Sequence, residues 1–314
     1  MTDAAAELPA PPGRWAHPGL RGALWGLLAV AVWAGSFVIT RMGVKAGLNA
    51  FDLVALRFAT AGALMVPILR RRGLAFDRLG LGGLVLLVAG SGAPYALMLA
   101  AGARYAPASH AAALTPGPMA AMTALLGALF LRERLPVIGW AGVGLILGGS
   151  ALIGGPSLFS GSGEGAALGH ALFLGGALMW AVYVIVLRRS GVGPLHATAI
   201  VATGSALLYL PLYLLVLPKG IGRAALPDIA LQAIYQGCFT TLVGLAAFNR
   251  AVILLGATGA AALPALIPVV TLGLGALMLG ETPNLAETAA TLLIGGGVLV
   301  TTLARNRRRP PSKT

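Results

Sequence analysis

The sequence predicts an all-α polytopic membrane protein with ten transmembrane helices, arranged as two inverted five-helix repeats. Three observations predict this fold class: the composition, the length of the apolar runs and an internal duplication. Of the 314 residues, 58% are hydrophobic and 10% are charged, and the mean hydropathy is +0.88. Because a soluble domain carries about 25% charged residues, this composition excludes a water-soluble globule.

Ten apolar runs are long enough to cross the roughly 30 Å hydrocarbon core of a bilayer, which takes about 20 helical residues. The runs are continuous and lack the short alternating segments of a membrane β-barrel. The first run is not a cleaved signal, because it continues to Thr40 and its pattern recurs in the sixth run. In order, the spans are expected at 22–40, 50–69, 80–101, 107–131, 136–154, 166–187, 194–217, 229–249, 256–279 and 285–304.

The basic residues predict the orientation, because Lys and Arg in short loops favour the cytoplasmic side. With the N-terminus inside, sixteen of the 22 Lys and Arg residues fall on the cytoplasmic side and five on the other, and Arg57 alone falls within a span. We therefore expect an integral protein of a bacterial-type inner membrane with both termini cytoplasmic. The net charge of +13 is then a topological signal at an anionic leaflet, so no nucleic-acid partner is expected.

An offset of 147 to 148 residues brings two halves of the chain into register. The segment from Gly127 to Glu133 matches the segment from Gly275 to Glu281, and Trp33 and Arg41 match Trp180 and Arg188. Because each half holds five spans, the second copy must enter the membrane inverted. The predicted organisation is a flexible cytoplasmic N-terminal tail at 1–21, a first five-helix repeat at 22–154, a Gly/Ser linker at 155–165, a second five-helix repeat at 166–304 and a basic cytoplasmic tail at 305–314.

Several motifs in this order resemble the EamA family of the drug/metabolite transporter superfamily, over about residues 22 to 304. They are Trp33 with Ser36, Leu56-Arg57-Phe58, and the fourth and ninth spans ending in Leu131-Arg132-Glu133 and Leu279-Gly280-Glu281. The resemblance implies two EamA-like repeats in a permease that exports amino acids or related metabolites by alternating access. It also implies that spans one to four and six to nine line the cavity, while spans five and ten are peripheral.

The catalytic and nucleotide motifs that would indicate an enzyme are missing: the sequence has no Gly-x-Ser-x-Gly, His-Glu-x-x-His, Walker A or Gly-x-Gly-x-x-Gly motif. Cys238 is the single cysteine, which excludes a Cys-based zinc site. We expect no enzyme activity, cofactor or metal. The expected partners are a small-molecule substrate and membrane lipids, and the expected assembly is a monomer or weak homo-oligomer. For the driving force the sequence leaves two alternatives open: proton antiport, with the proton as a further partner, and facilitated diffusion.

Titratable groups within spans are costly and therefore informative. No carboxylate falls in mid-membrane, which disfavours proton-coupled export of drug cations. Arg57 has two readings: it holds a substrate carboxylate or gates the cavity, or it pairs with backbone carbonyls as a structural residue. His110, at the start of the fourth span, either titrates during transport or donates to a backbone group at a helix start.

Polar and aromatic side chains inside the spans fall on helix faces and predict a wet cavity, although helix–helix hydrogen bonding is the alternative for each of them. The candidate lining is Trp33, Ser36, Thr40, Arg57, Ser91, Tyr95, His110, Trp180, Tyr183, Gln232, Tyr235, Gln236 and Asn249. Prolines that break or kink spans mark candidate gating positions, because non-helical backbone is tolerated only in protein or along water. These are Pro94, Pro116, Pro118, Pro264 and Pro268.

Together these features predict a secondary transporter that exports a small metabolite, such as an amino acid or a related zwitterionic or amphipathic solute. Inverted repeats place the substrate site of such proteins at the repeat interface. The alternatives are a lipid or nucleotide-sugar carrier and a non-transporting membrane scaffold of the same fold.

Overall fold

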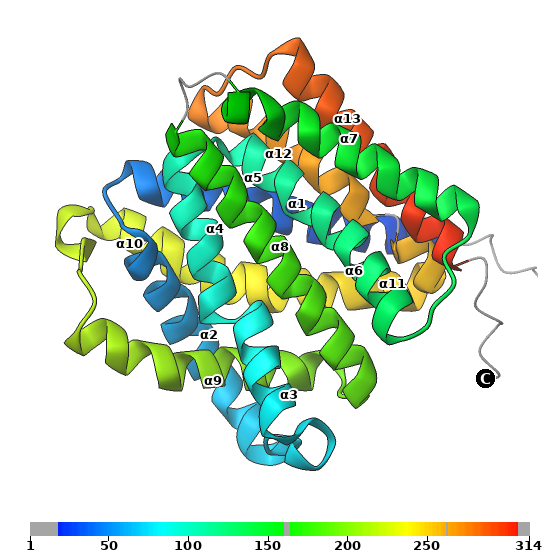
Figure 1. Ribbon diagram of the computed structural model, residues 1–314. Coiled ribbons are helices and arrows are strands. Elements are labelled where there is room, and N and C mark those ends of the chain that lie inside the picture. Colours follow the sequence, from blue (N-terminus) through cyan, green and yellow to red (C-terminus); the bar gives the residue numbers. More distant parts are fainter. Residues whose placement is uncertain (1–17, 160–163, 262, 307–314) are drawn as a thin grey trace, which may run out of the picture.

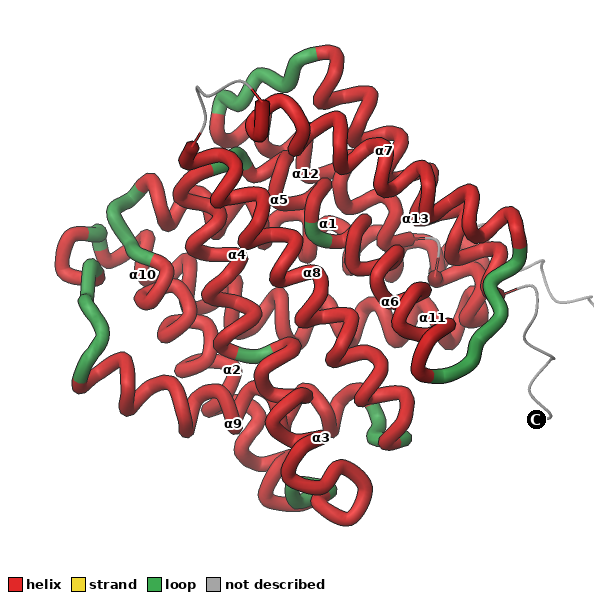
Figure 2. The backbone as a smooth tube through the Cα atoms, viewed as in Figure 1, coloured by secondary structure: helices red, strands yellow, loops and turns green. Residues whose placement is uncertain are grey.

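The computed structural model describes residues 18–159, 164–261 and 263–306, and every regular element in these residues is helical. Figure 1 shows the helices packed into one bundle, and Figure 2 shows that short loops join them. The first half contains α1 (Pro18–Lys45), α2 (Ala50–Arg72), α3 (Phe76–Ser91), α4 (Ala93–Tyr105), α5 (Ala108–Leu114), α6 (Pro116–Phe130) and α7 (Val137–Phe159).

The second half contains more interruptions than the first. Its elements are α8 (Glu164–Ser190), α9 (Pro194–Leu215), the 3-10 turn η2 (Ile221–Arg223), α10 (Leu226–Ile234), the π-helix η3 (Tyr235–Val243), α11 (Gly244–Ala261), the 3-10 turn η4 (Leu263–Leu266), α12 (Ile267–Leu279) and α13 (Leu285–Asn306). A π-helix is rare and often marks a functional site, and the sequence analysis did not predict this one.

The structure has nine helices that are long and apolar enough to cross a membrane, counted over the described residues. The predicted ninth span, 256–279, differs: residues 256–261 continue α11, and the apolar stretch that follows is the shorter Leu263–Leu279. Pro264 lies in the 3-10 turn η4, and Pro268 lies in the first turn of α12. Because proline has no backbone N–H, neither residue can donate the hydrogen bond that one longer α-helix would need at its position. An integral membrane protein with many apolar helices agrees with the prediction.

Four helices extend a few residues beyond the predicted segment boundaries. The first helix begins at Pro18, inside the tail predicted at 1–21, and α13 runs past residue 304 to Asn306. The linker predicted at 155–165 is shorter, because α7 continues to Phe159 and α8 begins at Glu164. Gly and Ser weaken a helix by only about 1 kcal/mol per residue, so an established span can continue through them. The remaining tail residues and 160–163 lie outside the described residues.

Two breaks divide predicted spans within the first half. Gly92 separates α3 from α4, a break visible in Figure 2, and Thr115 separates α5 from α6. At the first break, the Ala93 N–H donates to the Ser205 hydroxyl of α9 over 3.1 Å, so the freed backbone group is satisfied by another helix. A Cβ on Gly92 would collide with Ser205 Oγ and with the Val88 carbonyl, so glycine is required there.

The two halves of the chain interlock. α1 packs on α11, α2 on α9, α4 on α8, and α7 on α13, so each of these close pairs joins a helix of one half to a helix of the other. Large apolar side chains are exposed around the outside, including Leu207, Leu208 and Leu215 of α9. A continuous apolar exterior suits lipid, and the interface between the halves is left for polar groups.

Candidate functional site

A cavity of about 590 Å³ lies between the two halves. This volume is within the range of about 300–1,000 Å³ that small-molecule sites occupy. Its lining residues come from α1 to α6 of the first half and from α8, α9, η3, α11, η4, α12 and α13 of the second. No Asp or Glu side chain of the described residues lines it.

Most of the candidate residues named from the sequence lie on this cavity wall. They are Trp33, Ser36, Thr40, Arg57, Ser91, Tyr95, Trp180, Tyr183, Gln236 and Asn249, together with Pro116 and Pro264 from the helix breaks. They come from seven of the predicted spans, so the cavity is assembled by the fold and not by one local segment.

One wall is a polar seam between α1 and η3. Gln236 Nε2 donates to the Ser36 carbonyl over 3.0 Å and to the Thr40 hydroxyl over 2.8 Å. The Trp33 indole donates to the Thr240 carbonyl over 3.4 Å and packs against Phe248 with ring centroids 5.4 Å apart. The π-helical stretch places Gln236 opposite the hydroxyl face of α1, so the rare helix type positions a polar lining residue.

A second wall is aromatic. Tyr95 of α4 packs against Trp180 of α8 with ring centroids 5.4 Å apart, and Trp180 packs against Tyr183 at 5.1 Å. All three side chains line the cavity. Faces of such rings attract cations, and their bodies pack against apolar groups, so this wall fits an amphipathic solute that carries an ammonium group.

Arg57 is the one basic side chain on the cavity wall among the described residues. It lies on α2, and its guanidinium carbon is 5.5 Å from the centroid of the Phe58 ring. Its Nε is buried and has no hydrogen-bond partner, and no ion pair joins it to a carboxylate in the described part of the chain. The cavity therefore contains a cation that the protein leaves without a counter-charge.

Three candidates lie off the cavity wall. Gln232 is 1% exposed and donates to the Ile39 carbonyl over 2.5 Å, and the Tyr235 hydroxyl donates to the Val32 carbonyl over 3.2 Å. These bonds hold α10 and η3 against α1, as the helix–helix alternative anticipated. Pro94, Pro118 and Pro268 also lie outside the lining residues, although each stands next to a helix break.

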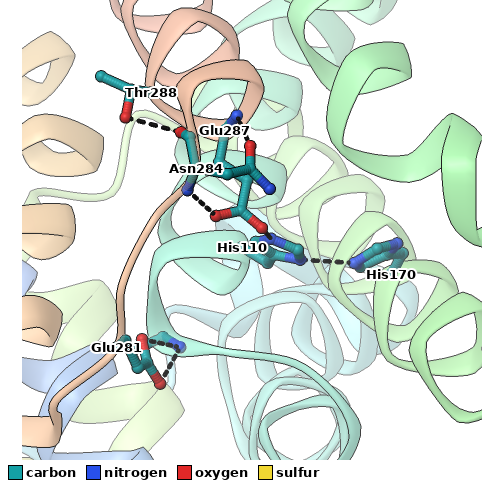
Figure 3. A network of polar contacts seen from close by, with 7 residues as sticks. His110, His170, Glu281, Asn284, Glu287 and Thr288 are labelled. Atoms are coloured by element: carbon teal, nitrogen blue, oxygen red, sulfur yellow. Dashed lines mark hydrogen bonds and ion pairs between the residues drawn. The ribbon is translucent and has the colours of Figure 1, made fainter.

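His110 is the third candidate outside the cavity lining, and it belongs to a different cluster. Its Nδ1 lies 2.9 Å from His170 Nε2, and its Nε2 lies 3.0 Å from Glu287 Oε1 (Figure 3). Glu287 also accepts from the Asn284 N–H over 3.0 Å, which is part of the cap of α13. The neighbouring Glu281 accepts from the Ala108 N–H at the start of α5.

The sequence analysis missed part of the lining. Thr123, Thr198 and Thr241 reach the cavity, as do Thr301 and Thr302 of α13. The resemblance had implied that the fifth and tenth spans are peripheral. In the structure α7, the fifth span, contributes none of the lining residues, but Thr301 and Thr302 of α13, the tenth span, line the cavity. A pair of threonines near the end of an apolar helix was the available signal.

These features define a polytopic membrane protein built around a solute-sized cavity. The model of the EamA-like transporter family matches residues 20–155 and 167–303, so this chain belongs to that family, within the drug/metabolite transporter superfamily. The two matched stretches also show that the chain contains two copies of the repeat.

Two curated relatives match nearly the whole chain. One, from Streptantibioticus cattleyicolor, is named "Probable terminal-alkyne amino-acid exporter" and is 29% identical over 308 residues, 93% of this chain and 98% of the relative. The other, an uncharacterized protein from Pseudomonas aeruginosa, is 30% identical over 287 residues, 90% of this chain and 94% of the relative.

A solved crystal structure shares the fold. It superposes with a TM-score of 0.59 at 21% identity and covers 92% of this chain and 99% of that chain. At this identity the likeness concerns the fold alone.

Proposed function

We propose that this protein is a secondary transporter that exports amino acids or related zwitterionic, amphipathic metabolites across the inner membrane. The observation that carries the proposal is the unpaired Arg57 on the wall of a solute-sized cavity that lacks acidic lining. The name of the Streptantibioticus relative as an amino-acid exporter supports the same substrate class.

The argument from Arg57 is electrostatic. Taking a guanidinium out of water costs several kcal/mol, and no carboxylate among the described residues pairs with Arg57 to offset this cost. A substrate carboxylate that binds in the cavity supplies the missing counter-charge, and a guanidinium fork can hold it with two hydrogen bonds. Binding of a carboxylate-bearing solute is therefore favoured over binding of a simple cation.

The rest of the cavity suits the other end of an amino acid. No acidic side chain of the described residues lines the cavity. The ammonium group of the substrate would therefore be held by the aromatic faces of Tyr95, Trp180 and Tyr183 and by backbone carbonyls near the helix breaks. The apolar lining, which includes Leu99, Met119 and Leu245, would receive an apolar side chain.

The transport cycle in this proposal is alternating access without ATP. The second repeat would be inverted relative to the first, and rocking of one repeat against the other would open the cavity to one side at a time. The distribution of the basic residues supports a cytoplasmic location of both termini in this proposal. The protein would act without a cofactor or enzymatic step.

The test is counterflow in proteoliposomes of the purified protein. Liposomes are loaded with an unlabelled amino acid, its decarboxylated amine or its amide, and entry of the labelled amino acid is followed. The proposal expects the amino acid to drive counterflow and the amine to fail. Arg57→Gln removes the preference for the carboxylate, whereas Arg71→Gln, an exposed arginine at the end of the same helix, leaves it unchanged. Counterflow driven equally by the amine, or absence of exchange with every solute, contradicts the proposed substrate class and favours the lipid-carrier or scaffold alternative.

A further inference from the structure

Two turns, 148 residues apart in the sequence, are built in the same way. In the first, Arg132 has a φ of 53°, and the Glu133 N–H donates to the Gly127 carbonyl over 3.2 Å. In the second, Gly280 has a φ of 66°, and the Glu281 N–H donates to the Gly275 carbonyl over 3.2 Å. Each turn ends a broken span, α6 or α12, with a left-handed residue followed by a glutamate.

The glutamate of each turn folds back over the glycine that begins it. A Cβ on Gly127 would lie 2.9 Å from Glu133 Oε2, and a Cβ on Gly275 would lie 3.0 Å from Glu281 Oε2. Each carboxylate therefore approaches the backbone of its own helix closely, at a glycine, where there is no side chain to displace it. The two carboxylates are held in equivalent places by equivalent parts of the two repeats.

Each carboxylate faces an arginine from the other repeat. Glu133 pairs with Arg188, at the end of α8, through both guanidinium nitrogens, Nη1 at 3.3 Å from Oε2 and Nη2 against Oε1. Glu281 Oε1 lies 3.8 Å from Nε of Arg41, near the end of α1. Arg41 and Arg188 occupy matching positions in the two repeats, so the two ion pairs are related by the duplication.

The two pairs lie at opposite ends of the bundle. In Figure 1, α1 ends at the upper left and α8 ends at the lower right. Both pairs adjoin the cavity: Leu187, next to Arg188, lines it, and so does Ala103, whose carbonyl accepts from Arg41. Each ion pair therefore ties one repeat to the other beside one end of the cavity.

The two ion pairs differ in their contact geometry. The Arg188–Glu133 contact is bidentate, with both carboxylate oxygens engaged. At the other end, Glu281 shares its two oxygens with the Ala108 N–H at 3.2 Å, and Arg41 Nε has no hydrogen-bond partner in the described residues. The Arg188–Glu133 pair is therefore in closer contact than the Arg41–Glu281 pair, although the two pairs occupy equivalent positions in the two repeats.

We propose that the ion pairs Arg188–Glu133 and Arg41–Glu281 act as the two latches of the transport cycle: each holds the two repeats together at one end of the bundle, and one pair forms a closer contact as the other separates. This inference rests on the alternating access proposed above. Rocking of the repeats separates surfaces at one end of the bundle and brings them together at the other, so the two latches cannot tighten together. The side chains are 15–34% exposed, and ion pairs that water can reach open at small cost, as a gate requires.

The experiment measures how reagents reach the two ends of the cavity in the full-length protein in detergent, where both ends meet solvent. In a Cys238→Ser background, Thr198→Cys reports on the Arg188 end of the cavity and Leu99→Cys reports on the Arg41 end. The rate of maleimide labelling is measured at each reporter. Glu133→Gln should raise the rate at Thr198→Cys and lower it at Leu99→Cys, and Glu281→Gln should do the reverse, each by roughly fivefold or more.

Matched controls are available at both ends. Arg189, beside Arg188, donates to the Phe130 carbonyl, and Lys45, beyond Arg41, donates to the Leu279 carbonyl. Arg189→Gln and Lys45→Gln should change neither rate. The exchanged pair Glu133→Arg with Arg188→Glu should restore the original ratio of rates, which separates a latch from a general loss of structure.

The latch proposal is wrong if the labelling rates at the two reporter cysteines change in the same direction, or if neither rate changes. If Glu133→Gln fails to fold, Arg188→Lys keeps the charge but loses the bidentate contact, and it should give a smaller shift of the same sign. Maleimide labelling needs no substrate, so it tests the latches independently of transport. Opposite changes of the two labelling rates in a protein that shows no counterflow would support the latches and refute the proposed function. Counterflow without reciprocal shifts would refute the latch alone.

Discussion

His110 and His170 lie 60 residues apart in the sequence, yet His110 Nδ1 is 2.9 Å from His170 Nε2. Since Glu287 accepts from His110 Nε2 at the other side of the ring, His110 is placed between an acceptor and a second imidazole. This chain joins α5, α8 and α13. Two residues before His110, the Ala108 N–H donates to Glu281, whose Oε1 lies 3.8 Å from Arg41 Nε, and the Arg41 guanidinium donates to the Ala103 carbonyl. The helices α6, α7 and α12 contain no titratable residue.

The first prediction concerns this chain as the proton site. His110 Nε2 lies 3.0 Å from Glu287 Oε1, so the imidazole joins α5 to α13, and His110→Gln removes that imidazole from the chain of contacts. We expect an imposed pH gradient to change the rate of wild-type counterflow and to have no effect on His110→Gln. The control is His196→Gln, whose ring contacts the Gly73 carbonyl at the other end of the bundle. A full pH response in His110→Gln would remove His110 from the mechanism.

The second prediction concerns Arg57. Because Arg57→Gln leaves a substrate carboxylate in the cavity without its counter-charge, we expect the KM for an amino acid to rise by about thirtyfold or more, from a loss of about 2 kcal/mol or more. Arg57→Lys keeps the charge without the planar fork and should give an intermediate KM. Concentration-dependent counterflow measures both values. An unchanged KM in Arg57→Gln would assign Arg57 a structural role.

The third prediction concerns the buried Asp52, which is 0% exposed. Its carboxylate accepts from the Asn49 N–H at 2.9 Å, the Tyr213 hydroxyl at 2.7 Å and the Gly220 N–H at 3.0 Å, and so fastens α2 to α9 and to the following loop. Asp52→Asn turns one acceptor into a donor, and we expect a loss of roughly 3 kcal/mol of stability. Thermal unfolding in detergent measures it. The exposed Asp77→Asn is the control, and equal melting temperatures for the two variants would contradict the prediction.

The fourth prediction concerns the break between α3 and α4. Gly92→Ala places a methyl group against Ser205 Oγ and the Val88 carbonyl, and overpacking of this kind costs about 1–3 kcal/mol. We expect a lower yield of monodisperse protein on size-exclusion chromatography and slower counterflow. In Gly82→Ala, within α3, the added methyl meets no atom within 4 Å, so both properties should stay at the wild-type level. Equal behaviour of the two variants would show that the break relaxes freely.

The helices could be read from the sequence because they depend on local chemistry. A run of apolar residues forms a helix in lipid regardless of its neighbours, since every backbone group must be satisfied within the segment. Proline and glycine act locally too, and α3 and α6 end or begin beside the residues that the sequence marked. The stripe formed by Trp33, Ser36 and Thr40 lines the cavity because a 3.6-residue period places these residues on one face.

The sequence by itself determined the membrane class, the helices and their breaks, and the family that the motifs resemble. Only the tertiary structure decided how each helix is rotated and what its polar side chains meet. Gln232 and Gln236 stand one turn apart in sequence, yet packing turns the first onto the Ile39 carbonyl and the second toward the cavity through a π-helix. Likewise, the side-chain partners of His110, Arg41 and Arg188 come from the other repeat, because contacts between distant segments arise from packing across the interface and leave no periodic signal in the sequence.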